Sequence, residues 1–585
     1  MASHSNLGRV SAIVLRSMRQ PLMTLLIVYS IAVLVMTFIP GIKVDGKTQY
    51  MSIFHAFYFM TYTATTTGFG EIPFEFSNAQ RIWAILCLYI SVIAWFYAIG
   101  TIIQLLQNPH LQQTINEERF ARAVKRIHGD FFILCGFGDT GSLLARGISE
   151  ANISCVIIER SEERIKALTL RDYKVLMPGV RANAGIPKYL IAGGVESPNC
   201  KAVICVTNNE ETNLKISTVA RLLNPSGMVI TKSKQDIYEE TLSTLGQQIH
   251  IVDPFTTFAH NLSAAVHNPM LYALSQWLVG SPSAPTLQNF ISPPRGVWVI
   301  CGYGKMGQEI CAMLHSQNIP TAVIDPHHPS DKVKDCTNRY VIGRTTTKTL
   351  TQAGIQTAAG LVAGTDDDGH NLSILLNARM LNPNLFTIVR QNRHENEAAF
   401  NAADVDIIMQ PSLVTARRIL FMLTAPLLEP FFKYLTNKHS EDINLMPSVV
   451  SRLEQTVGHH KPHLITIDID RKYSSATIDL LVRGEIVTLA EILRDMRNRN
   501  DRLQTVPLVI RSDKKVTILP PDSTTLKEND QILFCGQARA HHLLSSALDN
   551  EYALHYLRLG THKPRGYLMR WLTNKATQRQ QNATL

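Results

Sequence analysis

Two long stretches near the N-terminus contain no charged residue, and they constrain the fold more than any other feature of the chain. The first runs from Leu22 to Pro40 and has 19 residues, and the second runs from Ile82 to Leu106 and has 25. A helix rises about 1.5 Å per residue, so these stretches match a hydrocarbon core of about 30 Å. We therefore predict two membrane-spanning helices. A secretory signal is the alternative for the first stretch, but its apolar part is too long and no small-residue cleavage site follows.

Basic residues flank the outer ends of this pair of stretches. Three arginines precede the first and four basic residues follow the second, whereas the loop at 41–80 has two lysines and three acids. By the positive-inside bias, both termini and everything after residue 107 are expected in the cytoplasm, which fits a prokaryotic inner membrane. The whole chain of 585 residues is 45% hydrophobic and 18% charged, which excludes a many-spanning transporter and a mostly disordered chain. Its nine cysteines are scattered, as in a reducing compartment.

The loop between the two stretches contains an apolar segment that is too short to cross a membrane. Residues 51–65 are rich in aromatic side chains and lead directly into the sequence Thr-Thr-Gly-Phe-Gly-Glu at 66–71. Irregular backbone at membrane depth is tolerated where it is buried in protein or lines a water-filled cavity, which predicts a re-entrant helix followed by an extended strand. Gly68 and Gly70 allow backbone conformations in which successive carbonyls face one way. Such carbonyls, with the hydroxyl of Thr66, can replace the hydration shell of a cation.

The segment 57–73 resembles the pore helix and selectivity filter of potassium channels, whose usual core is Thr-Val-Gly-Tyr-Gly-Asp. The filter that the resemblance implies consists of Thr66, Thr67, Gly68, Phe69 and Gly70. It also implies K⁺ as the permeant ion and a homotetramer, because one pore loop per chain supplies a quarter of a four-fold pore. The unusual Thr67 leaves open a less selective cation channel of the same architecture.

The second span contains the candidate gating hinge. In related channels the inner helix bends at a glycine in its middle, and here the glycine nearest to that place is Gly100. A glycine lowers the cost of a bend, but a small residue also permits close helix packing in membranes. Both interpretations of Gly100 stay open.

The region after residue 130 contains one pattern twice. An apolar run enters a glycine loop, a helical pattern follows, and a second apolar run ends in an acid 23 residues after the first glycine. The residues concerned are Gly136, Gly138, Asp139, Thr140, Gly141, Glu159 and Arg160 in the first copy, and Gly302, Gly304, Lys305, Met306, Gly307 and Asp325 in the second. Each loop follows a strand and opens a helix, as in a β-α-β dinucleotide-binding unit.

These loops predict a nucleotide ligand. Backbone N–H groups at the start of a helix bind phosphate, and the acid accepts hydrogen bonds from ribose hydroxyls. An acid at that place disfavours a 2′-phosphate, so NAD, ADP, ATP or AMP fit better than NADP; Arg160 weakens this exclusion in the first copy. The alternative is that a copy keeps the fold and binds nothing.

Both copies resemble the RCK or KTN domains that regulate K⁺ conductance and form octameric rings beneath channels. Thr207 and Asn213 of the first copy match Thr365 and Asn371 of the second. Four chains with two copies each would supply eight domains, and the resemblance allows Ca²⁺ or another divalent ion as a further regulator. The copies depart from the family at Arg344, where Asp is common, and around residue 181, which does not align.

These features predict an α-helical two-span membrane pore domain, two α/β Rossmann-like domains and a C-terminal α+β lobe. The expected parts are a pore domain at 1–106 (helix 22–40, pore helix and filter 51–71, helix 82–106), a connector at 107–129, a first RCK domain at 130–279, a linker at 280–295, a second RCK N-lobe at 296–436, an RCK C-lobe at 437–550 and a basic tail at 551–585. Five short β-like runs mark the C-lobe, among them SSATIDLLV at 474–482. A solvated or disordered tail is favoured over one that binds anionic lipid.

Other polar and thiol side chains receive structural interpretations. Cys135 and Cys301 precede the glycine loops and are expected to be small buried hydrophobes rather than redox sensors. Two clusters suggest metal ligands but are better explained as polar surface loops. They are His459, His460 and His463, and Asp366, Asp367 and Asp368 with His370.

The interpretation that accounts for most of the chain is a ligand-gated potassium channel whose cytoplasmic ring changes shape when it binds a nucleotide or an ion. It requires no catalytic residue and no nucleic acid partner, and it places the pore domain among membrane lipids. A membrane-tethered NAD-dependent oxidoreductase is disfavoured, because neither glycine loop is accompanied by a convincing acid/base set and the pore loop would be unexplained. A regulatory partner of a separate transporter is a third option, against which the chain's own pore loop argues.

Overall fold

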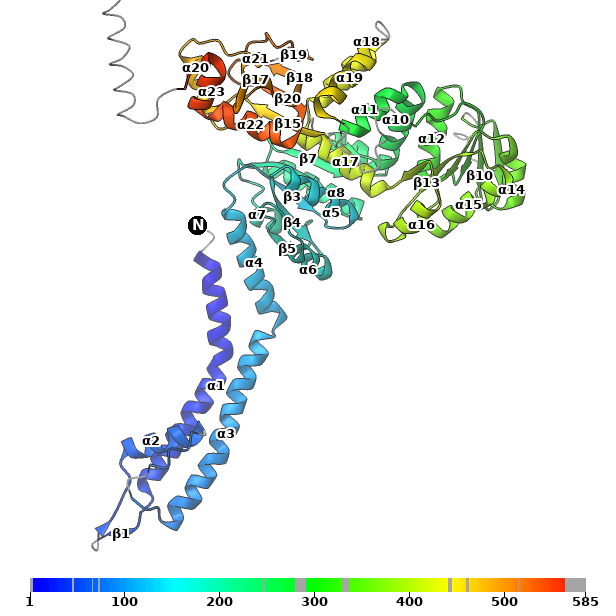
Figure 1. Cartoon of the computed structure of the whole chain (residues 1–585). Coiled ribbons are helices and arrows are strands. Elements are labelled where there is room, and N and C mark those ends of the chain that lie inside the picture. The colour runs from blue at the N-terminus through cyan, green and yellow to red at the C-terminus, as the bar shows by residue number, and fades with distance from the viewer. Residues whose placement is uncertain are drawn as a thin grey trace, which may run out of the picture. The chain divides into compact units, whose positions relative to one another are not determined.

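The computed structural model describes residues 4–44, 47–65, 67–71, 74–244, 246, 248–278, 291–328, 336–439, 445–458, 462–513 and 515–562. These residues form two compact units, one made mainly of the chain up to residue 128 and the other mainly of the chain from residue 129 on (Figure 1). The predicted filter residue Thr66, most of the linker, His459, His460 and the tail beyond residue 562 lie outside the described residues.

The N-terminal unit is built on two long helices that lie side by side. Its elements are α1 (His4–Phe38), β1 (Lys43–Val44), β2 (Lys47–Thr48), α2 (Ile53–Ala64), α3 (Asn78–Leu106) and α4 (Pro109–Lys125). The parts at 16–38 of α1 and 78–105 of α3 are long and apolar enough to cross a membrane, as the sequence predicts. Large apolar side chains along them are exposed in the single chain, for example Leu26 at 63% and Phe96 at 70%. Such surfaces suit contact with lipid or with further copies of the chain.

The helix ends differ from the predicted spans for local reasons. α1 starts well before residue 22, because a helix continues into its basic flank once the apolar part has formed. α3 starts at Asn78, ahead of the apolar run, because the side chain of Ser77 accepts a hydrogen bond from the backbone N–H of Gln80 while the Gln80 side chain accepts from the backbone of Ser77. The expected connector is mostly the helix α4.

The first α/β copy contains a parallel six-stranded sheet of order β5-β4-β3-β6-β7-β8. Its elements are β3 (Phe131–Cys135), α5 (Asp139–Glu150), β4 (Ser154–Glu159), α6 (Glu162–Leu170), β5 (Gly179–Arg181), α7 (Pro187–Ala192), β6 (Cys200–Cys205), α8 (Glu210–Leu223), β7 (Met228–Lys232), α9 (Asp236–Thr244) and β8 (Ile249–Val252).

The second copy repeats this arrangement in a sheet of order β11-β10-β9-β12-β13-β14. Its elements are β9 (Trp298–Cys301), α12 (Lys305–Ser316), β10 (Thr321–Asp325), β11 (Arg339–Ile342), α14 (Thr347–Ala353), η1 (Ile355–Thr357), β12 (Gly360–Ala363), α15 (Asp368–Leu381), β13 (Phe386–Arg390), η2 (His394–Asn396), α16 (Glu397–Ala402) and β14 (Ile407–Met409). Both sheets have the dinucleotide-binding order, in which ligands bind where the strand order reverses, between the first and fourth strands. That place lies between β3 and β6 and between β9 and β12.

Backbone hydrogen bonds show which residues of the second copy correspond to the segment around residue 181, which does not align in sequence. The backbone N–H of Ala182 donates to Glu159 O at 2.8 Å, and that of Gly343 donates to Asp325 O at 2.9 Å. The two segments therefore occupy the same place at the edge of each sheet, and Arg344 of the second copy corresponds to Asn183 of the first.

The helices after each sheet pack against the other copy. They are α10 (Pro254–His267) and α11 (Pro269–Leu278) after the first sheet, and α17 (Pro411–Thr424) and α18 (Leu428–His439) after the second. α10 packs on α12, and α17 packs on α5. Leu420 of α17 lies against Gly147 of α5, where a Cβ atom would overlap the leucine side chain. The two copies are thus joined by exchanged helices within one compact unit.

The C-terminal lobe combines an antiparallel sheet of order β15-β20-β18-β19 with a hairpin and several helices. Its elements are α19 (Leu445–Val457), β15 (His463–Asp468), α20 (Ser475–Val482), α21 (Leu489–Ile492), β16 (Arg494–Asp495), β17 (Asn498–Arg502), β18 (Thr505–Ser512), β19 (Lys515–Ile518), β20 (Gln531–Gly536), α22 (Ala538–Asp549) and α23 (Glu551–Leu559). The predicted fold class, two spans followed by two Rossmann-like domains and an α+β lobe, is confirmed.

Two expectations about this lobe are wrong. The run SSATIDLLV was expected to be β-like but forms α20, because contacts with α22 and α23 outweigh its β propensity. The basic tail does not begin at residue 551, because α23 belongs to the folded lobe. The Asn550 side chain caps α23 by accepting from two backbone N–H groups, and Leu554 and Leu557, three residues apart, are both fully buried.

Candidate functional site

The pore loop begins with a capped helix and continues in an extended segment held by tyrosines. The Ser52 side chain caps α2. At the other end of this helix, the carbonyl of Tyr62 accepts hydrogen bonds from the backbone N–H groups of Thr67 at 3.0 Å and Gly68 at 3.3 Å. The hydroxyl of Tyr62 donates to Glu71 O at 2.8 Å, and that of Tyr58 donates to Glu71 Oε2 at 3.1 Å. The extended segment at 67–71 is therefore fixed to the helix at both of its ends.

The two glycines of this segment have the left-handed backbone conformation. φ is +66° at Gly68 and +72° at Gly70, and Phe69 between them does not have a positive φ. Glycine adopts such angles without a steric penalty, and alternation of this kind can turn successive carbonyls toward the same side of a strand. The Phe69 ring packs edge-on against Tyr62 with 6.2 Å between centroids. The positive φ at both glycines distinguishes the segment from a regular strand, and the filter assignment stays a prediction.

The candidate hinge lies within an unbroken helix. α3 continues from Asn78 to Leu106 through Gly100, and a Cβ atom added there would meet no atom within 4 Å. Within the described residues of a single chain, close packing does not explain this glycine.

The glycine loops of the two copies have the same geometry. φ is +101° at Gly136 and +94° at Gly302, the first glycine of each loop. A Cβ atom at Gly141 would overlap the carbonyl oxygen of Gly136, and one at Gly307 would overlap that of Gly302. The middle glycine precedes α5 or α12 as its cap, without a side-chain hydrogen bond. The first N–H groups of each helix therefore lie beside a tight glycine turn, as phosphate binding requires.

The acids at the ends of the second strands hold the glycine loops. Glu159 accepts from the backbone N–H of Phe137 at 2.5 Å and of Ser161 at 2.8 Å, one bond to each oxygen. Asp325 accepts from the N–H of Tyr303 at 2.7 Å and of His327 at 2.9 Å, again through different oxygens. These carboxylates are mostly buried, so each one fixes the path of its loop whether or not a ribose is bound.

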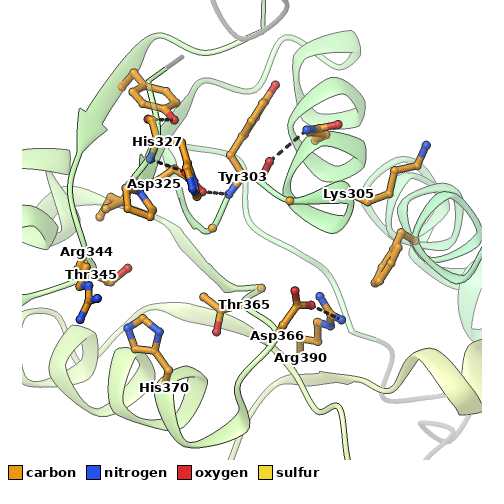
Figure 2. Close-up of a pocket in the computed structure, with 18 of the residues that line it drawn as sticks. Tyr303, Lys305, Asp325, His327, Arg344, Thr345, Thr365, Asp366, His370 and Arg390 are labelled. Atoms are coloured by element: carbon orange, nitrogen blue, oxygen red, sulfur yellow. Dashed lines mark hydrogen bonds and ion pairs between the residues drawn. The ribbon is translucent and has the colours of Figure 1, made fainter. Parts of the chain in front are cut away.

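A pocket of about 940 Å³ opens at the switch point of the second copy, beside the glycine loop (Figure 2). Its basic lining residues are Lys234, Lys305, Arg344 and Arg390, and its imidazoles are His327, His328 and His370. The acids Asp325 and Asp366 also line it. Figure 2 shows Arg344, Thr345 and His370 across the pocket from Lys305. The excess of basic groups favours an anionic ligand.

The inner end of this pocket links the two copies. Arg390 pairs with Asp366 at 2.7 Å, and its guanidinium lies 4.9 Å from the centroid of the Phe255 ring, which belongs to α10 after the first sheet. Lys234, from the first copy, lies over the same ring at 5.5 Å. The Nε of Arg390 is buried without a hydrogen-bond partner in the described part of the chain. Sequence reasoning missed Lys234, Phe255 and Arg390, because no motif marks them and they come from three separate segments.

The first copy differs at the corresponding positions. The guanidinium of Arg164 lies 3.3 Å from the place of a Cβ at Gly138, whereas a Cβ at Gly304 would meet nothing within 4 Å. The acid Asp139 stands where the second copy has Lys305. Burial lowers the pKa of Lys232, the counterpart of Arg390, to about 8. The loop of the second copy is therefore the more open and the more basic of the two.

Other motif residues have structural roles. Asn213 accepts from the N–H of Thr207 at 3.0 Å, and Asn371 accepts from that of Thr365 at 2.9 Å, so the matched pairs fix the turns after β6 and β12. Cys301 is fully buried, and burial raises its pKa to about 12, which suits a small core residue rather than a redox sensor.

Two aspartates of the cluster that the sequence predicts to be a polar surface loop accept hydrogen bonds from the backbone. In the Asp cluster, Asp367 caps α15 by accepting from the N–H of His370, and Asp368 accepts from the N–H groups of Asn392 and Arg393. Among the described residues, no group of three or more His, Cys, Asp or Glu side chains is placed to hold a metal ion.

Two protein families and several known proteins match parts of the chain. The TrkA-N domain family matches residues 132–253 and 298–411, and the ion channel family matches residues 3–108. The chain is 27% identical over 177 residues to probable potassium channel protein 2 of Methanocaldococcus jannaschii, covering 28% of this chain and 51% of the relative. It is 22% identical over 239 residues to potassium channel protein 1 of that organism, covering 41% and 69%. The solved GsuK channel bound to NAD is 16% identical with a TM-score of 0.42, covering 92% of this chain and 99% of that one.

The class of protein follows from these matches. The chain carries an ion channel domain followed by two TrkA-N domains, as the sequence predicts. It is related to potassium channel proteins. The match spans about half of the length of probable potassium channel protein 2.

Proposed function

We propose that this protein is a potassium channel opened or closed by a nucleotide that binds its cytoplasmic TrkA-N domains. The observation that carries the proposal is the pore loop, in which Gly68 and Gly70 have positive φ directly after a short helix and between two apolar spans. An oxidoreductase with a membrane anchor would have no use for this segment. The matched ion channel family and the potassium channel relatives also favour a channel over an enzyme.

The pore requires four chains. One loop per chain, with Thr66, Thr67, Gly68, Phe69 and Gly70, contributes a quarter of a carbonyl-lined filter for dehydrated K⁺. Threonine at position 67 is the feature that would permit a less selective cation channel, so the ratio of K⁺ to Na⁺ permeability decides between these alternatives. Both termini are proposed to lie in the cytoplasm of a prokaryotic cell, because the spans have basic flanks and the matched potassium channel proteins are prokaryotic.

The regulatory ligand is proposed to be an adenine nucleotide or NAD in the pocket of the second copy. Its phosphates would bind the first N–H groups of α12 beyond Gly304, with Lys305, Arg344 and Arg390 as counter-charges. Asp325 would accept from the ribose with the acceptor capacity that its bonds to Tyr303 and His327 leave free. In the first copy, the Arg164 guanidinium beside Gly138 occupies space next to the loop, so a ligand there must displace it.

Gating is proposed to follow from two shapes of an eight-domain ring. Four chains supply eight TrkA-N domains, and a ligand shifts the ring only by its difference in affinity for the two shapes. The bend is assigned to Gly100 of α3. A divalent ion remains an alternative regulator, but the described residues offer a nucleotide-sized basic pocket and no cluster of metal ligands.

Current through the purified protein in planar bilayers tests the proposal. We expect K⁺-selective current that changes when ADP, ATP, AMP or NAD is added on the cytoplasmic side. A protein truncated after Gly129 should conduct but no longer respond. Absence of current from the full chain would contradict the pore, whereas a full response of the truncated protein would contradict only the ring as sensor.

A further inference from the structure

A second cavity, of about 700 Å³, lies where the exchanged helices of the two copies meet. Its walls come from α10 and α11 after the first sheet and from β14, α17 and α18 at the end of the second copy. It shares no lining residue with the nucleotide pocket. Its volume is in the range of small-molecule sites.

Arg417 of α17 is the notable charge in this cavity. Its Nη2 is buried and has no hydrogen-bond partner in the part of the chain that the structure describes. Its Nη1 lies 3.5 Å from Gln276 Oε1, which is a long and weak contact. Burial lowers the pKa of Arg417, and the nearby Tyr272 opposes this effect. A guanidinium withdrawn from water without an anion is costly, so the fold maintains a charge that an anionic ligand would compensate.

The acids that line the cavity do not supply this anion. Asp406 lies on the rim, where its Oδ2 accepts from the N–H of Thr387 at 2.8 Å and from its hydroxyl at 2.7 Å. Asp253 uses Oδ1 to cap α10, and burial raises its pKa, which favours the neutral acid. Neither lies within ion-pair distance of Arg417 among the pairs between described residues.

One part of the wall is apolar and aromatic, and the remaining lining is polar, with His260, Asn261 and Ser275 among its residues. The rings of Phe421 and Phe432 stack with 6.2 Å between centroids, and the guanidinium of Arg418 lies 5.8 Å from the centroid of Phe421. Buried Phe258 and the half-buried Val414 add further apolar surface. The cavity therefore joins a cation with a buried Nη2 and a second, exposed cation to a wall that is apolar in part.

We propose that this cavity is a second regulatory site, which binds a small organic acid with an apolar body. The carboxylate of the ligand would pair with Arg417, and its body would pack against Phe421 and Phe432. Because the walls belong to both copies, an occupied cavity holds the exchanged helices in one arrangement. α10 contributes to both sites, since Phe255 lines the nucleotide pocket and Thr256 lines this cavity.

Fluorine NMR on the full-length protein in lipid nanodiscs tests binding, with para-(trifluoromethyl)benzoate as the probe. We expect saturable broadening of the probe signal by the unmodified protein. Arg417→Met should weaken binding by about tenfold to a hundredfold, the loss expected for one charge-assisted hydrogen bond. Arg452→Met, at an exposed arginine of α19, is the matched control and should bind as the unmodified protein does.

Gln276→Glu keeps Arg417 in place and tests the proposal if Arg417→Met folds poorly. The new carboxylate would pair with the guanidinium from within the chain and should abolish probe binding. The site would be overturned if the unmodified protein showed no saturable binding. It would also be overturned if Arg417→Met and Gln276→Glu both bound the probe with the affinity of the unmodified protein. Bilayer current tests the regulatory part, because the probe should change the open probability of the unmodified channel and not that of Gln276→Glu. The binding measurement requires neither channel current nor nucleotide. A negative binding result would therefore contradict this site alone and leave the proposed channel function untested by it.

Discussion

Replacement of Asp325 by Asn should loosen the second glycine loop even without a ligand. The two carboxylate oxygens of Asp325 accept from different backbone N–H groups, those of Tyr303 and His327. An amide has one oxygen and one NH₂ group, so in either orientation one of these donors faces another donor. Loss of a hydrogen bond to a charged acceptor costs about 1.5 to 3 kcal/mol. The free energy of local opening of the loop should fall by that amount.

Hydrogen exchange followed by mass spectrometry measures this opening. The peptide that contains the amide of Tyr303 should exchange about tenfold to a hundredfold faster in Asp325→Asn than in the unmodified protein. Glu159→Gln should have the same effect on the amide of Phe137, because Glu159 holds the first loop in the same way. Glu211→Gln, at an exposed residue that pairs with Lys215, is the control and should leave both loops unchanged.

Unchanged protection of Tyr303 in Asp325→Asn would refute this reasoning. The result also bears on ligand binding, since a variant with a loosened loop loses nucleotide affinity for two reasons. Exchange at Tyr303 shows how much of the loss comes from the loop, and the remainder reports the contact between Asp325 and the ribose.

Three further predictions concern other parts of the chain. Gly68→Ala should abolish or scramble K⁺ selectivity, because a Cβ strains a φ of +66°; an unchanged reversal potential in mixed K⁺ and Na⁺ would contradict the filter assignment. Gly307→Ala should lower the free energy of unfolding by about 1 to 3 kcal/mol in denaturant titrations, because its Cβ overlaps the carbonyl of Gly302; full stability would contradict the tight turn. Burial lowers the pKa of His541 to about 3, and His463 adds to this effect, so the folded lobe needs the neutral imidazole. The free energy of unfolding should therefore be highest above the ordinary histidine pKa of about 6.5, and it should decrease by about 2 kcal/mol as the pH falls from about 6.5 to about 5. His541→Gln should remove this dependence on pH.

Local patterns in the sequence were sufficient for the elements that depend on near neighbours. The two spans follow from uncharged runs of 19 and 25 residues, and the glycine loops follow from spacing repeated in both copies. The helix ends were less accurate, since α1 and α3 extend past the apolar residues that revealed them. The sequence also placed Glu159 and Asp325 beside their loops, because both lie at the end of the strand next to the one that enters the loop.

Tertiary structure decided which residues surround each site. Arg390, Lys234 and Phe255 belong to different segments, and only the packing of α10 against the second copy brings them to one pocket. The cavity at Arg417 likewise exists only because α11 and α17 meet. Packing also made a helix of residues 475–482, whose composition favours a strand. Sequence by itself determines the spacing of residues along a helix, strand or turn, since covalent geometry fixes it, whereas contacts between distant segments depend on how whole surfaces fit together.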